Sequence, residues 1–143
     1  TAAEEDRILL VHGPGQVSPD ELEPLFDRER ITALRGSIRA VRIGDAVRRY
    51  VVDVVRATRG LEGVELGASP RAAVALFRAT QAYAAMRGRE YALPDDVKVQ
   101  APGVLRHRLF LDANAQMRGR TPEAIVSEIL ARVPVPAEQS AAS

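Results

Sequence analysis

The sequence predicts a mainly α protein, a small helical bundle with at most a very short pair of strands. Apolar residues make up 46% of the 143 residues and charged residues 27%, the balance of an ordinary globular protein. Aromatic residues contribute only 4%, so the core must consist of Ala, Val and Leu, and alanine has the highest helix propensity. Helix starts are also legible in the sequence. The length favours one domain with a substantial core.

Four proline-containing segments mark these helix starts. A hydroxyl residue precedes proline at 18–19, 69–70 and 121–122. The hydroxyl can accept a hydrogen bond from a free backbone N–H, and proline at the first helical position loses no needed donor. Glu21 completes a capping box with Ser18. At the fourth start, 93–96, two acidic residues follow the proline and complement the positive end of a helix.

The elements follow from these starts and from hydrophobic periodicity. The stretch 45–58 is rich in valine, but its apolar residues recur at i, i+3, i+4, i+7 and i+8, which favours a helix over a strand. The stretch 69–87 is apolar around most of its circumference, which predicts a central, buried helix. Pro102 is expected to bend or interrupt the next helix. The expected helices span 3–11, 19–27, 29–37, 45–58, 69–87, 94–107 and 121–132, with a loop at 12–16 and short extended pieces at 64–66 and 109–111.

Several kinds of site are excluded by residue type. Only one of the 20 basic residues is a lysine, Lys98, and it does not follow a glycine, so the chain cannot contain a nucleotide-binding P-loop. The segment 13–15 (Gly-Pro-Gly) is therefore read as a plain loop. The chain has no cysteine for a disulfide, thiolate ligand or nucleophile. Its two histidines, His12 and His107, are isolated and cannot form a zinc site.

Other candidates have structural explanations. Asp95 and Asp96 resemble a metal-binding pair, but acidic residues in a first helical turn usually cap the helix. His107 is expected to contact helix carbonyls near a helix end. The formal charge of +1 and the interleaved acids and arginines argue against a nucleic-acid partner. No apolar run approaches the roughly 18 residues of a membrane span, and no signal peptide is evident, so a cytoplasmic protein is expected.

One arrangement favours a ligand. Arg71 is the second residue of the expected helix that begins after Ser69. A helix start attracts anions through its dipole and free N–H groups, and an arginine adds a planar fork suited to phosphate oxygens. The alternative is a solvent-exposed arginine after an ordinary helix cap.

Four ordered motifs connect Arg71 with a known family. They lie at 56–59 (RATR), 66–72 (LGASPRA), 88–97 (GREYALPDDV) and 104–109 (VLRHRL). This series resembles the C-terminal part of MoxR-family AAA+ ATPases, whose patterns read approximately aTR, GaSPRa, GRxyvxPdDV and vLxHRl. The resemblance covers about 50–111 closely, with a departure at 92–93, where Ala-Leu replaces a more usual Val-x.

The resemblance implies a helical AAA+ lid at 18–133, preceded at 1–17 by the end of an ATPase core and a connecting loop. The tail 134–143 is expected to be disordered. Arg71 corresponds to the sensor-2 arginine, which contacts the terminal phosphates of ATP, and Ser69 and Pro70 belong to the same binding segment. The nucleotide and Mg²⁺ would be held by the parent protein, and the fragment alone is expected not to hydrolyse ATP.

The resemblance also implies partners. These are the chain's own AAA+ core, neighbouring protomers of a hexameric ring, and a protein client matured by a chaperone-like ATPase. Arg71 would act either on the nucleotide of its own protomer or on that of a neighbour. The alternative is a stand-alone helical interaction module that never meets nucleotide, and an in-frame P-loop upstream would discriminate between the two.

Overall fold

The computed structural model describes residues 1–12 and 22–136. The loop expected at 12–16 is wrong at His12, which is helical, and its other residues lie outside the described ranges. The expected capping box of Ser18 and Glu21 and most of the C-terminal tail also lie outside them. The chain divides into two compact units, Thr1–Leu34 and Arg35–Ser143.

The first unit contains one complete helix, α1 (Ala2–His12), which confirms the helix expected near 3–11. The prediction of a helix over 19–27 is wrong for the described residues 22–27, which are not helical. Pro24 explains the difference, since proline disfavours helical backbone at the preceding residue. The next helix, α2 (Arg28–Ala40), begins after Asp27, whose Oδ1 accepts a hydrogen bond from the Arg30 N–H at 2.6 Å.

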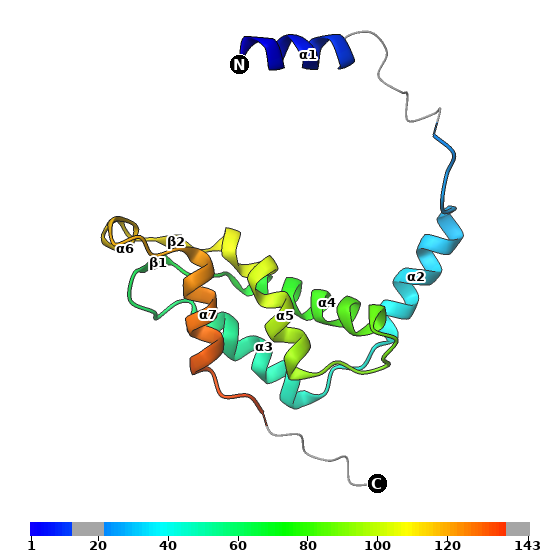
Figure 1. Ribbon diagram of the computed structural model, residues 1–143. Helices are drawn as coiled ribbons and strands as arrows, with labels where there is room; N and C mark the ends of the chain where they lie inside the picture. The colour runs from blue at the N-terminus through cyan, green and yellow to red at the C-terminus, as the bar shows by residue number, and fades with distance from the viewer. Residues whose placement is uncertain (13–21, 137–143) are drawn as a thin grey trace. The chain divides into compact units, whose positions relative to one another are not determined.

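The core of the second unit lies among four helices that contact one another and are drawn together in Figure 1. Its largest fully buried side chains include Tyr50, Leu76, Leu105 and Ile125, and its many valines and alanines match the low aromatic content. The core elements are α3 (Asp45–Ala57), α4 (Pro70–Met86), α5 (Pro94–Leu105), the 3₁₀ turn η2 (Arg106–Arg108) and α7 (Pro122–Arg132).

Helix α3 confirms the helical interpretation of a valine-rich stretch. Its buried positions are Val47, Tyr50, Val51, Val54 and Val55, the i, i+3, i+4, i+7, i+8 set of one helix face. The β-branched side chains therefore fill the core without imposing a strand, because the helical period decides which residues face inward.

Helix α4 corrects the expectation of a helix buried all round. It buries a single stripe at i, i+4 spacing, made of Ala72, Leu76, Thr80 and Ala84, while Val74 on another face is about half exposed. Alanine explains the difference. It raises the apolar count of a helix, but its small side chain does not require burial on every face.

Two short strands lie beside the helices. Strands β1 (Val64–Leu66) and β2 (Phe110–Leu111) pair antiparallel, with Val64 opposite Leu111 and Leu66 opposite Phe110. This pairing confirms the very short strand pair. The sequence did not predict α6 (Ala113–Met117), which follows β2 and begins where Asp112 Oδ1 accepts a hydrogen bond from the Ala115 N–H at 2.7 Å.

Pro102 lies inside α5 without ending it. The α-helix ends at Leu105, and η2 continues the chain, with the Arg106 N–H donating to the Pro102 carbonyl.

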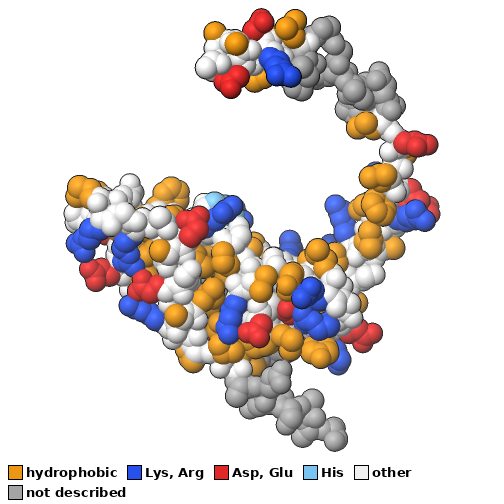
Figure 2. Space-filling view, in the orientation of Figure 1, with side chains coloured by type: hydrophobic (Ala, Val, Ile, Leu, Met, Phe, Trp, Pro, Cys, Tyr) orange, Lys and Arg blue, Asp and Glu red, His pale blue; other side chains and the backbone are white. Residues whose placement is uncertain are grey.

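Figure 2 shows apolar side chains reaching the surface among charged ones of both signs. Across the described residues, however, every helix falls short of the length and apolar character needed to traverse a bilayer.

Candidate functional site

Arg71 lies at the start of α4, as the sequence predicts. Pro70 is the first residue of the helix and Arg71 the second, and both are exposed, as is Ser69 before them. Within residues 1–12 and 22–136, the Arg71 guanidinium has neither a hydrogen-bond acceptor nor a carboxylate partner. It is therefore free to contact an anion from outside the described chain.

The start of α4 also lacks an acceptor of its own. Ser69 occupies the N-cap position in an extended conformation, but its hydroxyl makes no capping hydrogen bond, contrary to the capping role expected for it. No acidic residue lies in the first turn of α4. Three other helices differ, because α3 carries Asp45, α5 carries Asp95 and Asp96, and α7 carries Glu123 in that turn, whereas the short α6 has none.

The loop before α4 is fixed by the end of α3. The buried Thr58 hydroxyl donates to the Val55 carbonyl at 2.7 Å and accepts the Ala68 N–H at 2.9 Å. Arg59 Nε donates to the Ala68 carbonyl, also at 2.9 Å. Both backbone polar groups of Ala68 are thus held by two consecutive residues of the 56–59 motif.

Gly67 allows this close approach. A Cβ at Gly67 would lie 2.7 Å from both the Thr58 carbonyl oxygen and Arg59 Cα. These are backbone atoms, which cannot move aside as a flexible side chain can. The motifs 56–59 and 66–72 are therefore one packed unit that places the first turn of α4.

The acidic pair at the start of α5 serves the fold. Asp96 is buried and receives both Nη groups of Arg89, at 2.5 and 2.8 Å, together with the Leu93 N–H at 2.7 Å. Burial acts to raise the pKa of Asp96, but the hydrogen bonds from Arg89 and Leu93 and the Arg89 charge outweigh it, so the pKa is lowered. Asp95 is exposed and pairs with Lys98 at 3.0 Å.

The capping explanation of Asp96 is thus confirmed. Across the described ranges, His, Asp and Glu residues form no group of three or more that could hold a metal ion.

His107 does not behave as the sequence suggested. It is exposed in η2. Its Nε2 accepts a hydrogen bond from Arg108 Nε at 3.2 Å, whereas the sequence predicted a contact between the imidazole and helix carbonyls. The single lysine, Lys98, is committed to its exposed ion pair with Asp95 on α5. Neither His107 nor Lys98 forms a hydrogen bond or ion pair with Arg71.

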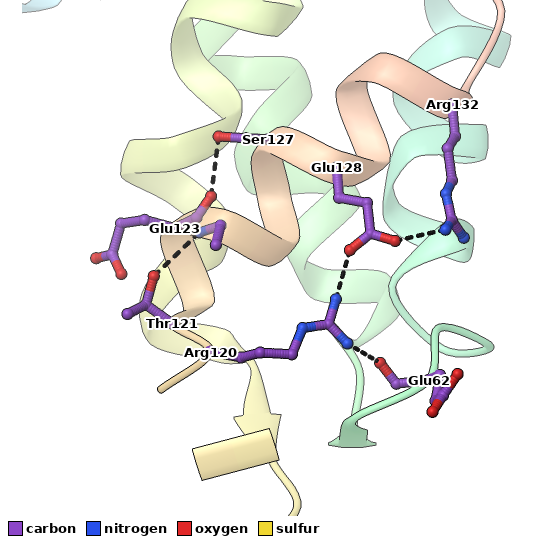
Figure 3. A network of polar contacts seen from close by, with 8 residues as sticks. Glu62, Arg120, Thr121, Glu123, Ser127, Glu128 and Arg132 are labelled. Carbon is purple, nitrogen blue, oxygen red and sulfur yellow. Dashed lines mark hydrogen bonds and ion pairs between the residues drawn. The ribbon is translucent and has the colours of Figure 1, made fainter. Parts of the chain in front are cut away.

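A second polar cluster, drawn in Figure 3, connects the segment before α7 with the loop before β1. Arg120 donates to the Glu62 carbonyl at 2.7 Å and to the Glu128 carboxylate, which also pairs with Arg132 at 2.6 Å. A small pocket adjoins Arg120, Gly63 and Asp112. Since the Arg120 guanidinium already binds Glu62 and Glu128, and Asp112 caps α6, both residues stabilise the fold.

Sequence reasoning missed the contacts of Thr58 and Arg59. The available signal was a threonine at the end of an apolar helix face, followed at a distance of about ten residues by Gly67 and Ala68. Threonine often bonds helix carbonyls, but which distant N–H it also receives depends on how the chain folds back.

Comparisons with known proteins identify the family to which the chain is similar. Residues 56–129, just over half of the chain, match the AAA lid domain family. An uncharacterised protein, YeaC, of Bacillus subtilis is 41% identical over 122 residues, covering 85% of this chain and 38% of YeaC. Chaperone MoxR1 of Mycobacterium tuberculosis is 33% identical over 158 residues, covering 94% of this chain and 42% of MoxR1.

Two further relatives extend the match. Protein MoxR of Paracoccus denitrificans is 31% identical, covering 95% of this chain and 46% of that protein. A crystal structure from Cytophaga hutchinsonii, of a protein provisionally described as an ATPase, superposes with a TM-score of 0.76 at 27% identity, over 94% of this chain and 43% of that one. The chain therefore spans less than half the length of the relatives it matches.

Proposed function

Because this chain belongs to the AAA lid domain family and resembles MoxR proteins over most of its length, we propose that it is the lid of an ATP-hydrolysing, chaperone-like AAA+ protein. In this proposal the helical unit closes over ATP, and Arg71 is the sensor-2 arginine that contacts the terminal phosphates. The segment 69–71 lines the phosphate side of the lid. The nucleotide and its Mg²⁺ are held by the ATPase core of the parent protein.

One observation carries the proposal. Arg71 is an exposed cation, without a partner in the described residues, in the first turn of α4, and that turn contains no acidic residue. The positive end of a helix dipole disfavours a cation, so this placement weakens the helix slightly unless an anion is bound nearby. Phosphate oxygens can accept hydrogen bonds from both the arginine guanidinium and the free N–H groups at the start of a helix.

The proposal extends to the whole protein. The segment 1–17 would be the end of the ATPase core and its connection, 18–133 the lid, and 134–143 a C-terminal tail. A hexameric ring of protomers in the cytoplasm would use ATP to act on a protein client. Arg71 would reach the nucleotide of its own protomer or of the adjacent one.

Replacement of Arg71 tests the proposal. In the full-length protein, Arg71→Ala is expected to lower the steady-state rate of ATP hydrolysis by roughly 10- to 1000-fold, because one preorganised donor is worth a few kcal/mol in the transition state. Arg78→Ala is the matched control, since Arg78 is an exposed arginine two turns further along α4. Equal turnover in the two variants would remove Arg71 from the mechanism and favour a stand-alone interaction module.

A further inference from the structure

We infer that Thr58 and Arg59 are the positioning residues of the site, which hold the loop 67–69 so that Arg71 faces the nucleotide phosphates. This inference rests on the proposed function, because it assigns a role toward the same bound phosphates. Neither residue touches the nucleotide in this account. They act through Ala68, three residues before Arg71.

Side chains hold both backbone polar groups of Ala68. Ala68 is fully buried, and its N–H and carbonyl are both bound by side chains from the end of α3. Thr58 is equally buried, and its hydroxyl uses its one proton on the Val55 carbonyl, so its lone pairs face Ala68. The directions of these two hydrogen bonds are thereby fixed: the Ala68 N–H donates to the Thr58 hydroxyl, and that hydroxyl donates to the Val55 carbonyl.

The clamp made by Thr58 and Arg59 determines where α4 begins. Ala68 is followed at once by the N-cap Ser69 and by Pro70, whose ring fixes φ. Ser69 makes no side-chain cap, so the first turn of α4 has no such anchor of its own. Only a short, partly rigid segment thus separates the clamped residue from Arg71, and a displacement at Ala68 would move the Arg71 backbone with it.

Small displacements are costly in this kind of site. Phosphoryl transfer depends on placement of charge around the phosphates, and a misplacement of about 1 Å can cost on the order of 10²-fold in rate. An exposed arginine has many rotamers, so a fixed backbone is the part of its placement that the lid itself can supply.

The first test measures the clamp in the 143-residue chain without nucleotide. Thr58→Val keeps the shape of the side chain but removes the acceptor, and is expected to speed hydrogen exchange of the Ala68 amide by about 3- to 10-fold or more, as one hydrogen bond is lost. Thr58→Ser restores the hydroxyl and should restore protection. Thr80→Val is the matched control, because Thr80 is a fully buried threonine in α4 whose hydroxyl donates to the Leu76 carbonyl and does not contact Ala68.

The second test measures coupling to Arg71 in the full-length protein. Thr58→Val should lower the rate of ATP hydrolysis, Thr58→Ser should largely recover it, and Thr80→Val should not reproduce the loss. When Thr58→Val is combined with Arg71→Ala, the double variant should be no slower than Arg71→Ala alone, because both act through one group.

The outcomes separate this inference from the proposed function. If Arg71→Ala slows hydrolysis but Thr58→Val slows it no more than Thr80→Val, the clamp is overturned and the sensor-2 role survives. If the two losses multiply in the double variant, Thr58 does not act through Arg71 and the inference is again wrong. If Arg71→Ala has no effect, the proposed function fails and the assigned positioning role fails with it, even where the Ala68 amide shows that the clamp exists.

Discussion

At the scale of single residues, Asp96 and Arg89 form the least exposed ion pair found in the described residues. The carboxylate is buried, receives a two-pronged hydrogen bond from Arg89, and accepts the Leu93 N–H. Its removal would leave the Leu93 N–H without this acceptor and would leave the partly buried Arg89 guanidinium with its bond to the Tyr91 carbonyl but no carboxylate. We expect Asp96→Ala to lower the free energy of unfolding by about 2–4 kcal/mol at pH 7, measured by urea denaturation.

The neighbouring acid supplies the control. Asp95 is exposed and its pair with Lys98 lies at the surface, so Asp95→Ala should change stability by at most about 1 kcal/mol. Because the pKa of Asp96 is lowered in the folded protein, its stabilising effect is present above the unfolded pKa of about 3.9 and is lost as pH falls through the folded value. The difference between wild type and Asp96→Ala should therefore shrink below about pH 4. Equal effects of the two substitutions at pH 7 would contradict this account.

Tyr50 presents the opposite case, a buried polar group without a partner. Its hydroxyl accepts and donates no hydrogen bond within the described structure, and burial raises the pKa of Tyr50. Since a buried unsatisfied hydroxyl costs about 1–3 kcal/mol, Tyr50→Phe should leave the unfolding free energy unchanged or increase it. Thermal and urea denaturation would measure this. A loss of more than about 1 kcal/mol would mean that the hydroxyl has a partner, such as a bound water.

At the scale of elements, the sequence predicted the helices where local chemistry decides the boundary. Thr121-Pro122 begins α7, and the Thr121 hydroxyl accepts the Ala124 N–H as expected of an N-cap. The pattern of α3 identified its buried face. Ser69-Pro70 also marks a helix start, but the Ser69 hydroxyl does not cap it, and Thr58 and Arg59, just after α3, bind the preceding residue instead.

The elements that were mispredicted depend on less local information. The segment 22–27 was assigned to a helix although it contains Pro24. Helix α6 was missed because five residues are too few to show a helical repeat of apolar residues. For α4, periodicity alone could not show which face of an alanine-rich helix would be covered. That depends on the arrangement of α3 and α5 around it, which is a property of the whole fold.

At the scale of the whole molecule, composition and motif order both predicted a small helical domain, and the motif order singled out Arg71. The one lysine of the chain does not follow a glycine, so the sequence contains no P-loop, and that lysine lies in an exposed ion pair. The order of the four motifs predicted the lid family, and their packing shows why two of them occur together. The motif 56–59 holds the motif 66–72, whereas Asp96 of the motif 88–97 receives Arg89 of the same motif.

The measurement that tests the central claim most directly is a structure of the full-length protein with a non-hydrolysable ATP analogue and Mg²⁺. The account predicts that an Arg71 guanidinium nitrogen lies about 2.7–2.9 Å from an oxygen of the terminal phosphate, on its own or a neighbouring protomer. The Ala68 contacts to Thr58 and Arg59 should persist in that state. If Arg71 instead points into solvent away from every bound nucleotide in a closed, nucleotide-loaded assembly, the proposed role of this lid is wrong.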